Sequence, residues 1–97
     1  MNSQQHIELS RIVGGLDALA SADYDPARRR APERGRARRA SATLAPLLMI
    51  PPQPDHSDAT VLADRLNALW LSLVDAHDMS SAHVVNRALA DLTEVDS

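Results

Sequence analysis

The residues best suited to chemistry are arginines gathered in one short stretch. Pro26–Ala40, called the arginine segment below, holds seven arginines against one acid, Glu33, and so carries a net charge of +6. Charge of one sign at this density favours an anionic partner, because it creates a strong local potential. The alternative is a solvated linker with incidental affinity for nucleic acid. The arginines are Arg28, Arg29, Arg30, Arg34, Arg36, Arg38 and Arg39.

No other group of residues predicts catalysis or metal binding. His77 and His83 are the closest pair of histidines, but six residues and a predicted turn separate them, and no pattern of metal ligands surrounds them. Ser80 and Ser81 precede His83, yet serines at this place are typical helix N-caps. We therefore expect no metal, no cofactor and no catalytic residue, and a protein that is not an enzyme.

The composition predicts one small cytoplasmic domain. The chain has 97 residues, no cysteine, no Phe and a single Trp, so its core is small and poor in aromatic side chains. Association with a second copy is a common remedy for such a core. The first residues lack the pattern of a secretion signal, and the longest apolar run, Leu44–Ile50, is far shorter than the roughly 20 residues that span a bilayer. We expect no membrane insertion.

The charge is distributed unevenly along the chain. The net charge is −3, so everything outside the arginine segment carries −9. From Ala45 onward, the chain has eight acidic residues and only two basic ones, Arg65 and Arg87. Phosphates dominate the affinity of proteins for DNA, so only the arginine segment offers the counter-charge that DNA binding needs.

The first half of the chain predicts one helix and one flexible region. Apolar residues recur every three or four positions within 1–22, which indicates an amphipathic helix able to bind a partner. Gly14 and Gly15 weaken this helix by about 1 kcal/mol each relative to Ala. Residues 23–42 offer almost nothing larger than Ala to bury, so we expect a flexible Arg-rich linker. Its last part, 33–42, could fold into a helix when a partner neutralises the arginines.

The middle of the chain combines an apolar run with a cluster of prolines. Leu44–Ile50 predicts a strand or a packed arm. Pro51-Pro52-Gln53-Pro54 excludes a helix and favours extended chain, because proline has no backbone N–H and restricts the residue before it.

The last part of the chain predicts a helical hairpin. The first helix is capped by Ser57 or Asp58 and ends near His77, and the second is capped by Ser80 or Ser81 and ends near Leu92. Each helix has an apolar face wider than the other can cover, so a second copy of the chain is expected to cover the rest. The residues assigned to this dimer core are Leu66, Leu69, Trp70, Leu73, Val84, Val85 and Leu89.

The segment Leu73–Leu92, with its turn at Asp78, its serines 80 and 81 and its Val-Val and Ala-Leu pairs, resembles the helix-turn-helix half of ribbon-helix-helix DNA-binding proteins. This resemblance implies a mainly α-helical, intertwined dimer in which 43–97 forms the dimerisation and DNA-binding domain. A ribbon strand is then expected at Ser57–Leu62 or at Thr43–Ile50. The resemblance also implies that the start of the second helix, Ser80, Ser81 and Ala82, offers backbone amides to a DNA phosphate.

The order of a basic region before such a domain is similar to that of small centromere-binding proteins of plasmid partition systems. This similarity implies binding of double-stranded DNA, with the arginines contacting phosphates or a Walker-type partner ATPase. A transcriptional repressor shares the same module. The alternative is a small helical protein-interaction module, such as an antitoxin or a phage-encoded inhibitor, that does not bind DNA directly.

Overall fold

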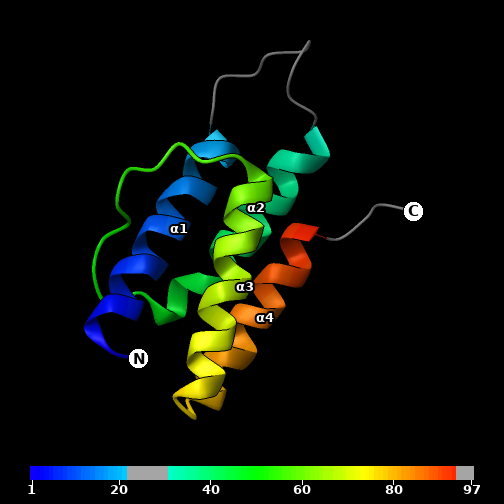
Figure 1. Cartoon of the computed structure of the whole chain (residues 1–97). Helices are drawn as coiled ribbons and strands as arrows, with labels where there is room; N and C mark the ends of the chain where they lie inside the picture. Colours follow the sequence, from blue (N-terminus) through cyan, green and yellow to red (C-terminus); the bar gives the residue numbers. More distant parts are fainter. Residues whose placement is uncertain (22–30, 94–97) are drawn as a thin grey trace.

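A computed structural model describes residues 1–21 and 31–93, with side chains from residue 34 onward in the second range. In these ranges all regular structure is helical (Figure 1). The elements are α1 (Ser3–Ser21), α2 (Ala31–Leu44), the short 3-10 helix η1 (Ala45–Leu47), α3 (Ala59–Asp75) and α4 (Met79–Thr93). The helix expected near the N-terminus and both helices of the hairpin are confirmed.

The predicted ribbon-helix-helix fold is wrong. That fold needs a β-strand, and no strand occurs within 1–21 or 31–93. Ser57–Leu62 instead forms the cap and first turn of α3, because the Asp58 carboxylate accepts a hydrogen bond from the Val61 amide at 2.9 Å. Thr43–Ile50 holds the end of α2 and η1, where Pro46 fits because the first turn of a helix does not need its N–H.

The α3–α4 hairpin supplies half of the core. Leucines spaced by three or four residues line one side of α3, and smaller apolar residues at the same spacing line α4. Full burial of each leucine stabilises the fold by about 1.5–3 kcal/mol. The chain reverses at His77, whose φ of 61° is left-handed, so this residue rather than Asp78 takes the unusual backbone conformation of the turn. The buried residues are Leu62, Leu66, Leu69, Leu73, Ala82, Val85, Ala88 and Leu92.

Helix α1 lies antiparallel to α3. The chain just before α1 lies beside the turn between α3 and α4, where the amino nitrogen of Met1 is 3.0 Å from Asp78 Oδ2. One turn further on, Gln5 Nε2 donates to Ser72 Oγ at 2.8 Å. The apolar face of α1 completes the core with Leu9, Ile12, Val13, Leu16 and Leu19.

Helix α2 corrects the prediction of a flexible linker over 23–42. Residues 22–30 lie outside the described residues, but residues 31–42 belong to α2. The helix packs through a narrow stripe of Ala37, Ala40 and Leu44, all fully buried. Small side chains let two helix backbones come close, so two alanines and a single leucine are enough to provide a packing face. In the apolar run after α2, Leu44, Leu47 and Leu48 pack against the core, which follows the packed-arm alternative rather than the strand, whereas Met49 and Ile50 are exposed.

The polar contacts of α2 show where it lies relative to α1 and α4. Ser41 Oγ donates to Asp17 Oδ1, and Thr43 Oγ1 donates to Asp91 Oδ2 at 2.7 Å. Asp17 is near the end of α1 and Asp91 is near the end of α4. Helix α2 therefore lies across the C-terminal halves of both helices, behind the hairpin in the view of Figure 1.

Residues 48–58 form an extended connection, called the strap below, that runs along the outside of α1 before α3 begins (Figure 1). Gln53 N donates to Ser10 O at 3.1 Å. A Cβ on Gly14 would lie 1.7 Å from Gln53 O, and a Cβ on Gly15 would lie 2.8 Å from a methyl of Leu62. The glycine pair that weakens α1 as an isolated helix therefore lets the strap and α3 approach its backbone.

Within 1–21 and 31–93, no helix has the length and apolar character needed to cross a bilayer.

Candidate functional site

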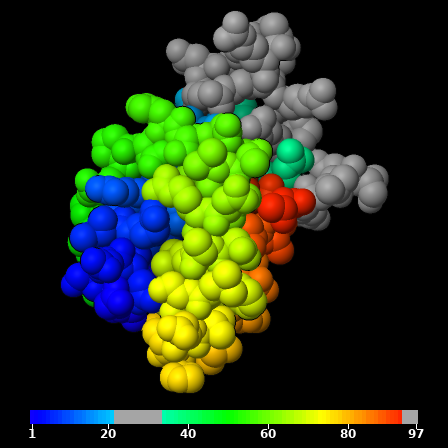
Figure 2. Space-filling model, viewed as in Figure 1, coloured from blue at the N-terminus to red at the C-terminus, as the bar shows by residue number. Residues whose placement is uncertain are grey.

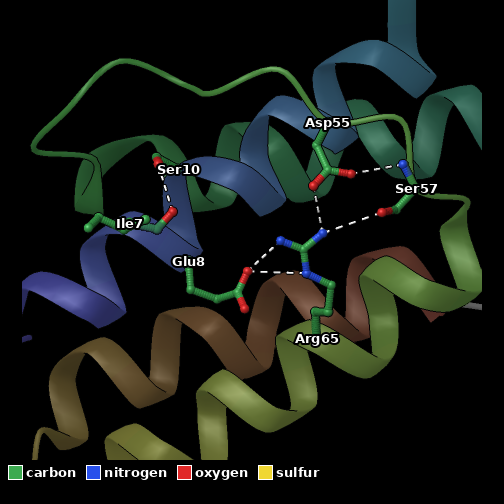
Figure 3. Close-up of polar contacts among 6 residues, drawn as sticks. All are labelled: Ile7, Glu8, Ser10, Asp55, Ser57 and Arg65. Atoms are coloured by element: carbon green, nitrogen blue, oxygen red, sulfur yellow. Dashed lines mark hydrogen bonds and ion pairs between the residues drawn. The ribbon is translucent and has the colours of Figure 1, made fainter.

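The most connected polar cluster centres on Arg65 of α3. Figure 3 shows its guanidinium between Glu8 of α1 and the strap residues Asp55 and Ser57. Its Nε donates to Glu8 Oε1 at 3.1 Å, and Nη2 pairs with the same oxygen. Its Nη1 donates to Asp55 Oδ2 at 2.8 Å and, at 3.4 Å, to Ser57 Oγ. One side chain thus ties together three segments that are far apart in the sequence.

The electrostatics of this cluster favour the charged forms of Asp55 and Arg65. Hydrogen bonding to Ser57 and then to Arg65 holds the pKa of the Asp55 carboxyl well below its ordinary value. Burial opposes the charge on Arg65, but its hydrogen bonds to Asp55 and Glu8 outweigh burial and raise the pKa of the guanidinium. A guanidinium already paired with two carboxylates has little capacity left for an external anion. The cluster is therefore a latch that fixes the strap to α1 and α3.

A shallow depression of about 230 Å³ lies beside this latch, between α1 and α3. It is open to solvent, and polar and apolar groups line it in about equal measure, whereas sites for small molecules are usually larger, concave and mostly apolar. Its only acidic or basic lining side chains are Glu8 and Arg65, which already pair with each other. It is lined by Asn2, Gln4, Gln5, Glu8, Arg65, Ala68, Leu69 and Ser72.

The arginine segment is divided between the described and undescribed parts of the chain. Arg28, Arg29 and Arg30 lie outside the described residues. Arg34 and Arg36 are half-buried on α2, and Arg34 Nε donates to Ala20 O at 3.4 Å, at the C-terminal end of α1 where a cation is favoured. Arg38 and Arg39 are exposed. The predicted basic cluster therefore has at least two guanidinium groups at the surface of an ordered helix.

The predicted phosphate site at the start of α4 is already filled by the chain itself. Asp78, not a serine, caps this helix: its Oδ1 accepts from Ser81 N at 3.3 Å and its backbone oxygen accepts from Ala82 N at 3.0 Å. Hydrogen bonds to the N-terminal amino group and to Ser81 lower the pKa of Asp78, so its carboxylate stays charged. Ser80 is exposed and Ala82 is buried. A phosphate at Ser80–Ala82 would meet this negative charge at the position where it needs free amides.

The residues assigned to a dimer core lie inside one chain. Leu66, Leu69, Leu73 and Val85 are buried, and the remaining three, Trp70, Val84 and Leu89, are half-buried. Helices α1 and α2 cover the apolar faces of the hairpin that a second copy was expected to cover. The argument for a homodimer from this hairpin therefore falls away, and the homodimer itself stays a prediction.

Among residues 1–21 and 31–93, no three His, Cys, Asp or Glu side chains lie close enough together to hold a metal ion. Sequence reasoning missed the Arg65 latch, because nothing in the spacing of residues 8, 55 and 65 brings them together. The Gly14-Gly15 pair was the one available signal that another backbone crosses α1.

Comparisons with protein-family models, with curated proteins and with solved structures gave no match to this chain.

Proposed function

We propose that this protein binds double-stranded DNA through the arginine segment, most of which lies on α2. The observation that supports this best is that α2 has one buried face and one exposed face. Its alanines and Leu44 face the core, and Arg38 and Arg39 are exposed on the same helix. A helix held in this way presents guanidinium groups to solvent without the cost of ordering a free chain.

Charge supports DNA phosphates as the target of this surface. The arginine segment carries +6, whereas the rest of the chain carries −9 and repels a polyanion. This contrast confines contact to the segment and orients the protein on the duplex. Guanidinium groups hold phosphate oxygens with paired hydrogen bonds, which position a protein on DNA without reading its sequence. The proposed binding is therefore largely independent of sequence and fits the cytoplasmic location that the sequence predicts.

The test is fluorescence anisotropy with a labelled duplex of about 20 base pairs at about 50 mM salt, where non-specific complexes are strong enough to measure. The double variant Arg38→Ala/Arg39→Ala should bind several-fold more weakly than the wild type. The matched control Arg11→Ala/Arg87→Ala removes two other exposed arginines, on α1 and α4, and so changes the net charge equally. This control should bind DNA nearly as well as the wild type.

Two results would overturn the proposal. The first is equal weakening by the two double variants, because binding would then depend on net charge alone. The second is tighter binding of an RNA duplex of the same length, which would assign the surface to RNA. Helical content measured by circular dichroism checks that both variants fold, since Arg and Ala have similar helix propensity.

A further inference from the structure

The strap carries a feature that DNA binding does not use. All six residues of its first part, from Met49 to Pro54, are exposed, and Met49 reaches 75% and Ile50 36% exposure. Met49 and Ile50 are adjacent in the sequence, whereas the other large apolar residues that are exposed, Ile7, Val61, Leu71 and Met79, are separated from one another along the chain. Figure 2 shows the green atoms of the strap at the surface beside the blue atoms of α1.

The sequence favours a polyproline II conformation for Pro51–Pro54, which follows a bend at Met49 and Ile50. Each proline fixes its own φ, and Ile50, Pro51 and Gln53 each precede a proline, which disfavours the α conformation. Leu48, just before, is already extended, with φ −71° and ψ 125°. A polyproline II helix has three residues per turn and rises about 3.1 Å per residue. In that conformation Pro51 and Pro54 are one turn apart, which puts their rings on the same edge, about 9 Å from each other.

The strap is held at several points while its outer side stays free. Gln53 N bonds to Ser10 O, Gln53 Nε2 donates to Pro51 O at 3.1 Å, and Asp55 is fixed by the Arg65 latch. At the other end, Leu48 N donates to Ala45 O at 3.1 Å. A segment fixed in this way loses little conformational entropy when a partner binds it.

We infer that Met49–Pro54 is a docking ridge for a protein domain whose aromatic-lined groove accepts a polyproline II segment. Such grooves take proline side chains separated by one turn and use the preformed helix to limit the entropic cost of binding. Pro51 and Pro54 provide this spacing, and Met49 and Ile50 extend the apolar contact. The inference is independent of the proposed DNA binding, because the ridge and the arginine segment share no residue.

The experiment is an NMR titration of the 15N-labelled full chain with purified SH3, WW and EVH1 domains, which are the established classes of such grooves. At least one domain should bind more tightly than about 1 mM, with the largest shifts at Met49, Ile50 and Gln53. Pro51→Ala/Pro54→Ala should weaken this binding at least about tenfold. The matched control is Pro46→Ala, an exposed proline in η1, which should bind like the wild type.

A second variant separates loss of contact from loss of the strap's structure. Ile50→Asp keeps every proline and adds a charge to the apolar contact, so it should also weaken binding while the Gln53 amide signal of the unbound chain stays unchanged. A peptide of residues 47–56 should bind at least about threefold more weakly than the full chain, because it lacks the anchors. The inference is overturned if no domain binds, if Pro46→Ala weakens binding as much, or if the peptide binds as tightly as the chain.

Discussion

Gly14→Ala tests the packing of the strap on α1 most sharply, because two arguments predict opposite signs. Helix propensity alone predicts that replacing a mid-helix glycine by alanine stabilises the protein by about 1 kcal/mol. The structure predicts the reverse, since the new Cβ would lie 1.7 Å from the backbone oxygen of Gln53. A carbon and a carbonyl oxygen need more than 3 Å, so the strap must move away from the helix.

The size of the effect follows from what that movement breaks. The hydrogen bond from Gln53 N to Ser10 O is lost, at about 0.5–1.5 kcal/mol. Forcing an extra methyl group into a packed contact costs about 1–3 kcal/mol more. Subtracting the gain in propensity leaves a net destabilisation of about 0.5–3.5 kcal/mol. In a chain of this length, each kcal/mol lowers the melting temperature by about 4–8 °C.

The assay is urea unfolding followed by circular dichroism, with Gly35→Ala as the matched control. Gly35 lies on α2 with open space around it, since the nearest atom to its Cβ would be Arg39 Nη1 at 3.9 Å. Gly35→Ala should therefore stabilise the protein by about 0.5–1 kcal/mol. The reasoning is refuted if Gly14→Ala stabilises the protein as Gly35→Ala does, because the strap would then not lie against α1.

Further predictions concern carboxylates that hold the fold. The pKa of Asp55 is depressed from 3.8, so its contribution to stability is full above that pH and is lost as the pH falls below it. Asp55→Asn should lower the free energy of unfolding by about 1–3 kcal/mol at neutral pH and show a smaller further loss below about pH 4, and parallel pH profiles for variant and wild type would contradict this. Asp78→Ala should lower the melting temperature because it removes the cap of α4, whereas Ser80→Ala should leave it unchanged; the opposite order in a thermal melt would restore the serine cap that the sequence predicts.

The parts of the fold that the sequence predicts are those with large apolar residues at helical spacing. The leucines of α3 and the Asp58 cap are local signals, and both match the structure. A helix over 33–42 was expected only when a partner neutralises the arginines, because the packing face of α2 consists of Ala37, Ala40 and Leu44, and alanines carry almost no hydrophobic signal. The ribbon strand was expected by resemblance over about twenty residues of the hairpin, but that pattern is shared by any short antiparallel helix pair.

The candidate site was less predictable than the fold. The Arg65 latch joins residues from α1, the strap and α3, and such a contact depends on the tertiary arrangement rather than on spacing along the chain. The charge of the arginine segment is visible in the sequence, but the exposure of Arg38 and Arg39 depends on which face of α2 is buried. The proline cluster predicted extended chain correctly, although not the backbone contact at Gly14 that fixes it.

The salt dependence of DNA binding tests the central proposal most directly. For duplex DNA, the logarithm of the binding constant falls with the logarithm of salt concentration by about 0.9 per neutralised phosphate. If Arg38 and Arg39 each contact a phosphate, Arg38→Ala/Arg39→Ala should reduce the magnitude of this slope by about 2, whereas Arg11→Ala/Arg87→Ala should leave it unchanged. Equal slopes for the wild type and both variants would contradict the proposal that α2 presents these arginines to DNA.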